Sequence, residues 1–563
     1  MGAERIKKRN MLIWLIMIGL SVFRISLMVS TPAYLIGNSG YDDAFQVNQA
    51  LQICVGNWLD EYCVTTLSKG ISFPVFLCLA KLLCMPYFML LGIFYCASAA
   101  AFLTACRSEI KNPWAKLVIY AYLIFNPVGF SGDVTQRIYR NAILYPTVLL
   151  VISAFIGAFL RKDRPKKEYV PWLVLSGAAF TFFYYIREDS VWLMPMVIAV
   201  AVLIAVWSLM HKKNRKRLVL LVIPVMIFFG VTVAYKAVNY KVYGEFIICD
   251  RTYGYFAEVT EKFLQVEEGQ SDDKTAWVSR ETLTKIIEEC PSLKEGEDLI
   301  LGYYNSWAGE DNIKGDLYVW ALRDAFQEMG HFSSADELQR FSKQVCEEMD
   351  CAFEEGRLHE NGRIFLSPQA RGLERDEISG FLKHALRNWY DEITYKCATY
   401  TGLTPAVGSE SEIRVMEAMT GAHGIRGINS EGDEDSLGYM QGYIATISYK
   451  AERGYIVMHK LIFVIAVLCW MLLLVNYIRK PDWNGFEKII VPFGLLLNTF
   501  VLEIGLAFMV EWLGYPGIWF YSSGILPLLS VFEILSIYGG ISLIRRGAGK
   551  NKENIEKAEA END

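Results

Sequence analysis

The chain has 563 residues, of which 53% are hydrophobic and 21% charged, and 55 basic against 61 acidic residues give a net charge of −6. This hydrophobic content is too high for an intrinsically disordered protein, and the charge balance shows no nucleic-acid-binding surface. A soluble enzyme carries roughly a quarter charged residues, spread along its length. Here long apolar blocks alternate with short charged stretches, so the sequence predicts an integral membrane protein.

Ten apolar segments are long enough to cross a bilayer, which requires roughly 20 residues of helix. The first follows a basic N-terminus and has no small-residue cleavage site, so we expect it to be retained rather than removed as a signal peptide. The apolar segment 71–86 is shorter and contains Lys81, and we expect a juxtamembrane or re-entrant helix there, with a short tilted span as the alternative. The ten predicted spans are 11–30, 87–105, 113–131, 142–160, 169–186, 191–210, 218–236, 460–478, 489–510 and 518–544.

Basic residues are concentrated in alternate loops, and cytoplasmic loops carry the excess of Lys and Arg. Residues 1–10 hold four basic residues, 161–168 hold five, 212–217 hold five and 545–552 hold four, whereas the intervening loops are poor in them. This pattern predicts a multi-pass protein of the cell membrane with both termini in the cytoplasm. The long polar region 237–458 is then extracytoplasmic.

The predicted fold class is therefore an all-α polytopic membrane protein with a mostly α-helical extracytoplasmic domain. The charged C-terminal tail has no apolar core and is expected to be disordered. The predicted divisions are a seven-span module at 1–236 with its outer loop at 31–86, the extracytoplasmic domain at 237–458, a three-span module at 459–546 and a cytoplasmic tail at 547–563.

The first outer loop places two acidic residues, Asp42 and Asp43, directly after the first span. Carboxylates at the membrane boundary are candidates for general bases. The alternative is structural, because aspartates also favour the start of a helix through capping and the helix dipole.

Two further outer loops supply charges at the same membrane level. Arg137 and Arg140 are one helical turn apart in the second loop, and Arg187, Glu188 and Asp189 lie between two apolar spans in the third. Charges at membrane depth are costly and usually face a cavity or one another, so salt bridges within the third loop are the structural alternative.

Carboxylates and cations at the outer lipid boundary suit glycosyl transfer from a polyprenyl-phosphate sugar. The lipid tail of such a donor lies in the bilayer, and its phosphate gains negative charge as it leaves. Arginine matches two phosphate oxygens with its planar fork, and a carboxylate can take the proton of the acceptor hydroxyl. The sequence has no phosphate-binding loop of the GxxxxGK[ST] type, so it does not point to a nucleotide donor.

Several short segments occur in an order that resembles the GT-C superfamily of polytopic membrane glycosyltransferases, in particular a bacterial branch that is similar to the protein mannosyltransferases and depends on dolichyl- or polyprenyl-phosphate sugars. These segments are YDDAFQ (41–46), GNWL (56–59), TLSKGISFPVFL (66–77), QRIYRNAILYP (136–146) and IREDSVWLMP (186–195). The resemblance implies a catalytic carboxylate at Asp42 with Asp43 in support. It also implies donor-phosphate binding by Lys69, Arg137, Arg140 and Arg187, with Tyr139, Glu188 and Asp189 as supporting residues. Where many members have an Arg-Tyr pair before a late span, the region 519–529 of this chain has no Arg.

The expected partners are a polyprenyl-phosphate-linked sugar donor, membrane lipids and a glycan, protein or lipid acceptor, with no nucleic acid. We predict no metal ligands; no cofactor is certain, and a divalent cation is left open. Cys54 and Cys63 are the one plausible local disulfide. The alternative functions are a transporter or lipid flippase, and a non-catalytic membrane scaffold whose outer domain binds a partner.

Overall fold

The computed structural model describes residues 2–267, 273–309, 311–396, 404–426, 439–513 and 518–560. Throughout these ranges the regular structure is helical, and extended segments pair only through isolated bridges. The predicted all-α polytopic fold is therefore confirmed.

Helices occupy all ten places at which the sequence predicts spans. They are α1 (Gly2–Val29), α4 (Tyr87–Ala105), α5 (Pro113–Ile124), α6 (Leu144–Phe159), α7 (Lys166–Tyr184), α8 (Met194–Met210), α9 (Val222–Tyr243), α18 (Tyr439–Arg479), α19 (Trp483–Leu513) and α21 (Leu526–Ala560). Within the described ranges, eight helices are long and apolar enough to cross a membrane. The other two are α5, which has only 12 residues, and α7, which starts with the charged residues Lys166 to Glu168. The chain is thus a multi-pass membrane protein.

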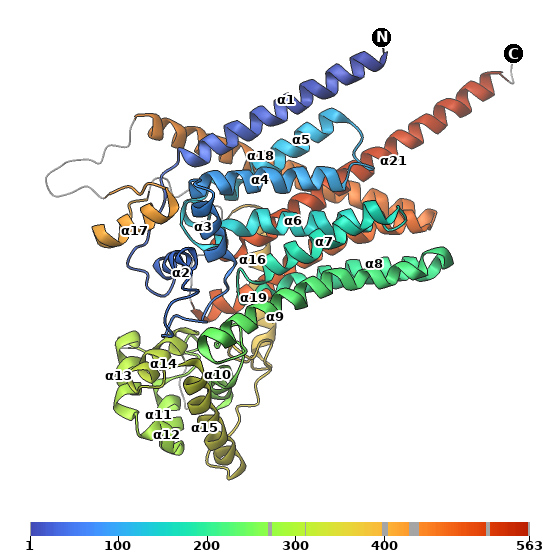
Figure 1. The fold of residues 1–563 in the computed structure, drawn as a ribbon. Helices are drawn as coiled ribbons and strands as arrows, with labels where there is room; N and C mark the ends of the chain where they lie inside the picture. Colours follow the sequence, from blue (N-terminus) through green and yellow to red (C-terminus); the bar gives the residue numbers. More distant parts are fainter. Residues whose placement is uncertain are drawn as a thin grey trace.

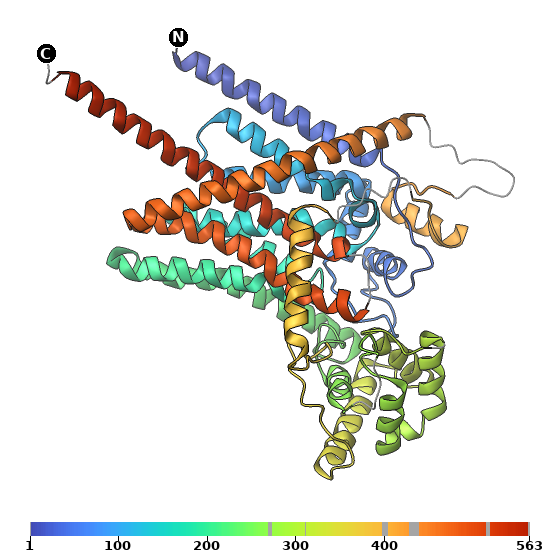
Figure 2. The same ribbon diagram turned by 180° about the vertical axis from the view of Figure 1, so that it is seen from behind.

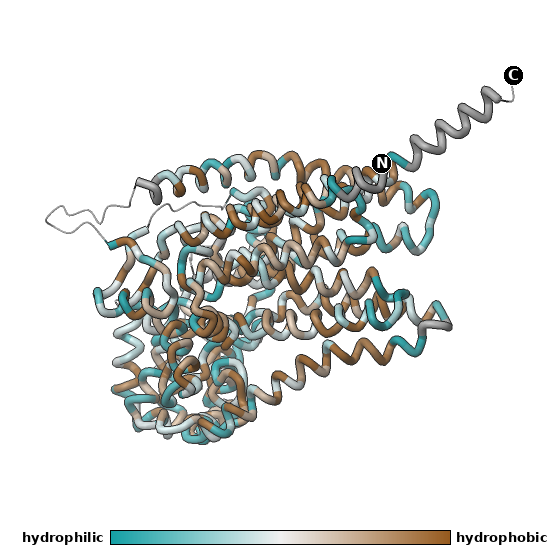
Figure 3. The backbone as a smooth tube through the Cα atoms, turned by 45° about the horizontal axis from the view of Figure 1, so that its top comes forward, coloured by the Kyte–Doolittle hydropathy of each residue, from teal (hydrophilic) through white to brown (hydrophobic). Residues whose placement is uncertain are grey.

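Helix α6 lies at the centre of the membrane helices, between α4, α7 and α21. Its apolar segment is 94% buried inside the protein, whereas the segment of α9 is only 6% buried. Large apolar side chains such as Phe229 and Leu461 remain exposed on the outer helices, as expected for a surface that faces lipid rather than water. Figure 3 shows the long helices as mostly hydrophobic, with hydrophilic residues in the loops that join them.

The two chain ends lie at the same end of the helix layer. In Figures 1 and 2 the start of α1 and the end of α21 point the same way, while the helices α10–α15 gather at the opposite end. Helix α21 continues to Ala560 and so runs through most of the tail for which we expected disorder. This tail is rich in Ala, Glu and Lys, which have high helix propensity. Residues 561–563 lie outside the described ranges.

The polar region 237–458, which we call the inserted region, contains a helical body with its own hydrophobic core. Its helices are α10 (Tyr255–Gln265), α11 (Arg280–Glu289), α12 (Pro291–Lys294), α13 (Glu297–Ala308), α14 (Leu317–Glu328) and α15 (Ala335–Glu354). Each longer helix is amphipathic, and the apolar faces meet in a core that includes Phe263, Ile286, Phe326 and Val345. We refer to α10–α15 as the outer body.

The rest of the inserted region packs on other parts of the chain. Helix α16 (Glu377–Ile393) crosses α19, as Figure 2 shows, and α17 (Glu410–Thr420) packs on α2 (Asp43–Val55) and α3 (Ser72–Leu82). Helix α3 is a short apolar helix of 11 residues, in the place where we expected a juxtamembrane or re-entrant helix. Helices α9 and α18 extend past the boundaries predicted at 236 and 459.

Candidate active site

An extended segment after α1 carries the first aspartate into position. Tyr34 pairs with the second outer loop, where its N–H donates to the Gln136 carbonyl at 2.9 Å, and Gly37 N–H donates to the Val407 carbonyl at 2.7 Å. These contacts fix the segment between two parts of the chain that are about 100 and 370 residues away along the sequence. The turn that follows places Asp42 at the start of α2.

Asp42 does not cap that helix. No backbone group of α2 donates to its side chain. Instead its carboxylate forms an ion pair with the Lys69 ammonium and accepts a hydrogen bond from the Tyr139 hydroxyl at 2.9 Å. Both aspartates do mark the start of α2, as the structural alternative expected, but the Asp42 side chain forms no capping hydrogen bond there. Its side chain stays 44% exposed, so a substrate can reach the carboxylate.

Asp43 has a different environment although it is the next residue. Its carboxylate is fully buried and accepts two hydrogen bonds from Arg137, from Nε at 2.8 Å and from Nη2 at 2.5 Å. The Arg137 guanidinium also stacks on the rings of Tyr139 and Phe520, each at 4.9 Å. Asp43 therefore holds an arginine in a fixed orientation rather than facing the open side of the site.

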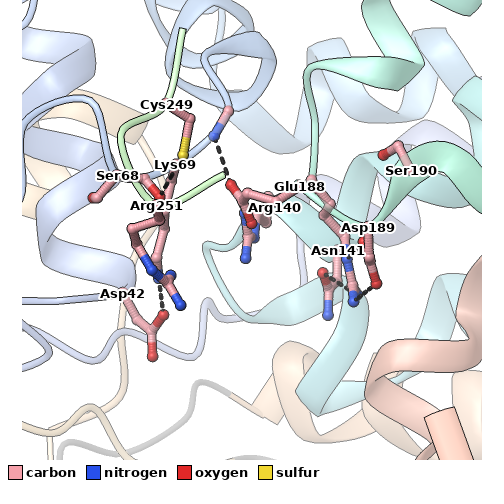
Figure 4. A network of polar contacts seen from close by, with 12 residues as sticks. Asp42, Ser68, Lys69, Arg140, Asn141, Glu188, Asp189, Ser190, Cys249 and Arg251 are labelled. Carbon is pink, nitrogen blue, oxygen red and sulfur yellow. Dashed lines mark hydrogen bonds and ion pairs between the residues drawn. The ribbon is translucent and has the colours of Figure 1, made fainter. Parts of the chain in front are cut away.

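Lys69 belongs to a tightly held loop between α2 and α3. Its side chain is only 4% exposed, and Figure 4 shows it directed at Asp42. The next residue has to be glycine, because a Cβ on Gly70 would lie 2.3 Å from the Tyr185 carbonyl oxygen. The Gly70 N–H donates to Glu188 at 2.8 Å, so the third outer loop fixes the backbone that carries Lys69.

The arginines of the second and third loops are also paired with acids. Arg140 donates through Nη1 to both oxygens of Glu188, at 2.9 and 2.8 Å. Arg187 holds Asp189 with two nitrogens, at 2.8 and 2.5 Å, and donates to the Asn141 side chain at 3.3 Å. The salt bridge that was the structural alternative for the third loop thus forms between Arg187 and Asp189, whereas Glu188 links that loop to the other two.

Burial and neighbouring charges set the protonation of the site. Burial raises the pKa of Asp42, but Lys69 and Arg140 outweigh it and bring the pKa to about 2. Burial together with Arg140 lowers the pKa of Lys69 to about 8, against the opposing effect of Asp42. The pKa of Glu188 falls to about 2, because Arg140, Arg251 and Lys69 outweigh burial. At neutral pH both carboxylates are therefore anions, and most Lys69 side chains carry a charge.

All nine residues singled out from the sequence belong to this one network of side chains. They are Asp42, Asp43, Lys69, Arg137, Tyr139, Arg140, Arg187, Glu188 and Asp189. The structure adds residues that the sequence did not single out. Phe520 stacks on Tyr139 at 5.5 Å between ring centroids, and the Arg187 guanidinium lies 5.1 Å from the Tyr521 ring. Both aromatics come from the late segment that lacks an arginine, and no sequence signal tied them to the outer loops.

Arg251 and Trp320 are two further additions, and both come from the inserted region. The Arg251 guanidinium lies 4.7 Å from the Trp320 ring, and the Lys69 ammonium lies 5.8 Å from the same ring. Figure 4 shows Arg251 with Lys69, Asp42 and the residues of the third loop. The only sequence signal was that Arg251 lies about 15 residues after the seventh predicted span, and Trp320 had none.

The acids of the site are all paired with basic side chains. Each of the four carboxylates is ion-paired with a lysine or arginine of the chain. Among the residues that the structure describes, no three His, Cys, Asp or Glu side chains are grouped so that they could hold a metal ion.

The predicted disulfide does not form. Cys54 Sγ lies 2.7 Å from Cys78 Sγ of α3, and Cys63 contacts the Thr65 and Thr66 hydroxyls. All the cysteines in the described ranges are free thiols. Cys54 lies in α2 while Cys63 belongs to the following loop, which turns toward the outer body, and this separates the two thiols.

Comparisons with known proteins do not identify a family for this chain. No protein-family model and no curated protein matches the sequence. Two solved structures are similar, both of ArnT from Cupriavidus metallidurans. The apo state has 12% identity and a TM-score of 0.29, and covers 93% of this chain and 77% of that one. The form bound to undecaprenyl phosphate has 10% identity and a TM-score of 0.28, with coverage of 92% and 77%. TM-scores this low carry no weight for the function of this chain.

Proposed function

We propose that the protein is an inverting glycosyltransferase of the GT-C type, which moves a sugar from a polyprenyl-phosphate donor to an extracytoplasmic acceptor. One observation carries the proposal. A half-exposed carboxylate, Asp42, faces a buried Lys69, and arginines from two other loops belong to the same network at the end of apolar helices. A lipid-linked donor with an anionic leaving group requires this combination at the lipid boundary.

The chemistry is a single displacement. The acceptor hydroxyl oxygen attacks the anomeric carbon, the bond from that carbon to the phosphate oxygen breaks, and the configuration inverts. Asp42 takes the hydroxyl proton, and the polyprenyl phosphate leaves with the bonding electron pair. A carboxylate with a pKa of about 2 is a weak base, so it receives the proton late, when the attacking oxygen is already bonded and acidic.

The cations stabilise the charge that develops on the leaving phosphate. Lys69, Arg140 and Arg187 come from three different loops, and each is already held in place by an acid. Hydrogen-bond donors that are already in position before the reaction stabilise the transition state without having to reorganise. We assign Lys69, Arg137, Arg140 and Arg187 to the donor phosphate, and Tyr139, Glu188 and Asp189 to their support. Asp43 supports Asp42 indirectly, because it orients Arg137.

The proposed orientation places the active site on the extracytoplasmic side and both termini in the cytoplasm. The outer body lies at the end of the helices opposite to both termini, and the basic loops 161–168 and 212–217 follow α6 and α8 at the end near the termini. Lys and Arg prefer the cytoplasmic side. The membership in the GT-C superfamily and in its protein-mannosyltransferase-like branch is part of this proposal.

The proposal is tested with purified protein, a panel of polyprenyl-phosphate sugars and mass spectrometry of the products. We expect release of the polyprenyl phosphate and transfer of one sugar with inversion for at least one donor. In parallel, lipid-linked sugars and envelope glycans are compared in cells with and without the gene. No transfer from any such donor, together with unchanged glycans, would reject the glycosyltransferase assignment.

A further inference from the structure

The chain that leads into the outer body is joined to the loop that carries Lys69. The segment between α9 and α10 runs alongside this loop, where Asp250 N–H donates to the Leu67 carbonyl at 3.0 Å and the Cys249 thiol donates to the Ser68 carbonyl at 3.5 Å. Leu67 has a φ of +52°, which is unfavourable for a leucine and persists only where neighbours hold the backbone. The inserted region therefore belongs to the architecture of the site.

Arg251 extends from this segment toward the charged network. Its guanidinium and the Lys69 ammonium share the Trp320 ring, at 4.7 and 5.8 Å. It is also one of the charges that lower the pKa of Glu188, second only to Arg140 among the cations. A fifth cation therefore lies beside Lys69, and it comes from a different part of the chain than the other four (Figure 4).

The hydrogen bonds of Arg251 leave room for a ligand. Its Nη2 donates to Asp316 at 2.8 Å, but this carboxylate is 40% exposed and so is partly solvated. The buried Nε has no hydrogen-bond partner among the described residues. Arg137 and Arg187, by contrast, each hold a carboxylate with two nitrogens. A buried guanidinium N–H without an acceptor is unfavourable, and an incoming anion relieves it.

We propose that Arg251 is an additional phosphate-contacting residue, which the segment between α9 and α10 contributes beside Lys69 and which Trp320 and Asp316 of the inserted region hold in place. The ligand is the phosphate group of the polyprenyl donor, whose oxygens match the guanidinium fork. The inserted region then completes the donor site, and an outer body that is displaced from the membrane helices leaves this site one cation short. This inference rests on the proposed function, because it names a contact within the same donor site.

The test is binding rather than turnover, so that it does not depend on knowing the sugar or the acceptor. The full-length protein in detergent micelles is titrated with a polyprenyl monophosphate. We expect Arg251→Gln to weaken the affinity by about 10- to 100-fold, which corresponds to the loss of one charge-assisted contact. Arg251→Lys keeps the charge but loses the fork, and should give an intermediate affinity. Asp316→Asn removes the competing carboxylate and should bind at least as tightly as the wild type.

Arg340→Gln is the matched control, since Arg340 lies on α15 of the same body, is 67% exposed and pairs only with surface acids of its own helix. It should bind like the wild type, and thermal unfolding should show that all variants are folded. Unchanged affinity in both Arg251 variants would overturn the inference while leaving the glycosyltransferase proposal intact. A wild-type protein that fails to bind the polyprenyl monophosphate would instead overturn both.

Discussion

Asp42 and Asp43 are consecutive in the chain, yet their carboxylates contact different cations, Lys69 and Arg137. The first is 44% exposed and the second is fully buried. This difference separates a carboxylate that a substrate can reach from one that holds a neighbouring arginine, and it predicts different consequences for the two substitutions.

Asp42→Asn should lower the rate of sugar transfer by about 10²- to 10⁴-fold, which is the usual contribution of a general base. It also leaves the buried Lys69 ammonium without its carboxylate, but Lys69 has a pKa lowered to about 8 and can lose its proton, so the fall in stability should be smaller than for Asp43→Asn. Asp43→Asn should instead lower the free energy of unfolding by about 3 kcal/mol, because it leaves the Arg137 guanidinium without its buried carboxylate. Transfer assays and denaturant unfolding of both variants provide the measurement. Full activity of Asp42→Asn would remove Asp42 as the base.

The lowered pKa of Lys69 predicts an upper pH limit for activity. Its pKa of about 8 means that the ammonium is charged below that pH and loses its proton as the pH rises through 8, which weakens its hold on the leaving phosphate. We therefore expect kcat/KM to fall above about pH 8. The pKa of Asp42 is about 2, so no acidic limb from this residue should appear between pH 5 and 8. In Lys69→Arg the guanidinium stays charged, and the alkaline limb should disappear from the accessible range. An identical profile in that variant would show that another group titrates.

Glu188 competes with a phosphate for the same cations. Its carboxylate accepts from Arg140 and from the Gly70 N–H, and it stays ionised because Arg140, Arg251 and Lys69 lower its pKa to about 2. Glu188→Gln should therefore bind a polyprenyl monophosphate several-fold more tightly but turn over more slowly, since Arg140 and the Lys69 loop lose their anchor. Binding titrations and initial rates separate the two effects. Weaker binding would mean that Glu188 mainly positions the cations and does not compete with the phosphate.

The Asp250–Arg323 pair should determine how firmly the outer body holds the site. Both side chains are fully buried, and Arg323 also donates to the carbonyls of Val64 and Thr66 in the Lys69 loop. Asp250→Asn leaves a buried charge unpaired, which costs about 3–5 kcal/mol. We expect a large fall in thermal stability together with weaker phosphate binding. The exposed pair Asp336–Arg340 is the control, and Asp336→Asn should change stability by about 0.5 kcal/mol or less.

Native Cys351 gives a direct measurement of sidedness. It is exposed on α15 of the outer body, and the proposed orientation predicts that a membrane-impermeant maleimide labels it in cells whose cytoplasmic membrane is intact. A cysteine introduced as Asp163→Cys, in the basic loop after α6, should react only after the cytoplasmic membrane has been permeabilised. The Cys351→Ser variant measures the background labelling by the other cysteines of the chain. The reverse pattern would place the charged network on the cytoplasmic side.

The sequence by itself determined the membrane helices and much of the charged set. Apolar segments long enough to span a bilayer can bury their backbone polar groups only as helices, so the ten places could be predicted from composition and length. Charges at the ends of such helices are rare and stand out, which is why Asp42, Arg140 and Arg187 could be named in advance, whereas Lys69 was implied by the resemblance to the GT-C superfamily.

Only the tertiary structure decided which acid holds which cation, and what the inserted region adds. The Asp42–Lys69, Asp43–Arg137 and Arg140–Glu188 pairs join residues that are 27 to 94 positions apart, and Arg251 reaches the site only because α9 returns the chain to the Lys69 loop. Such contacts depend on how the helices pack and where the outer body attaches. Local patterns of hydrophobicity and charge carry no information about this long-range geometry.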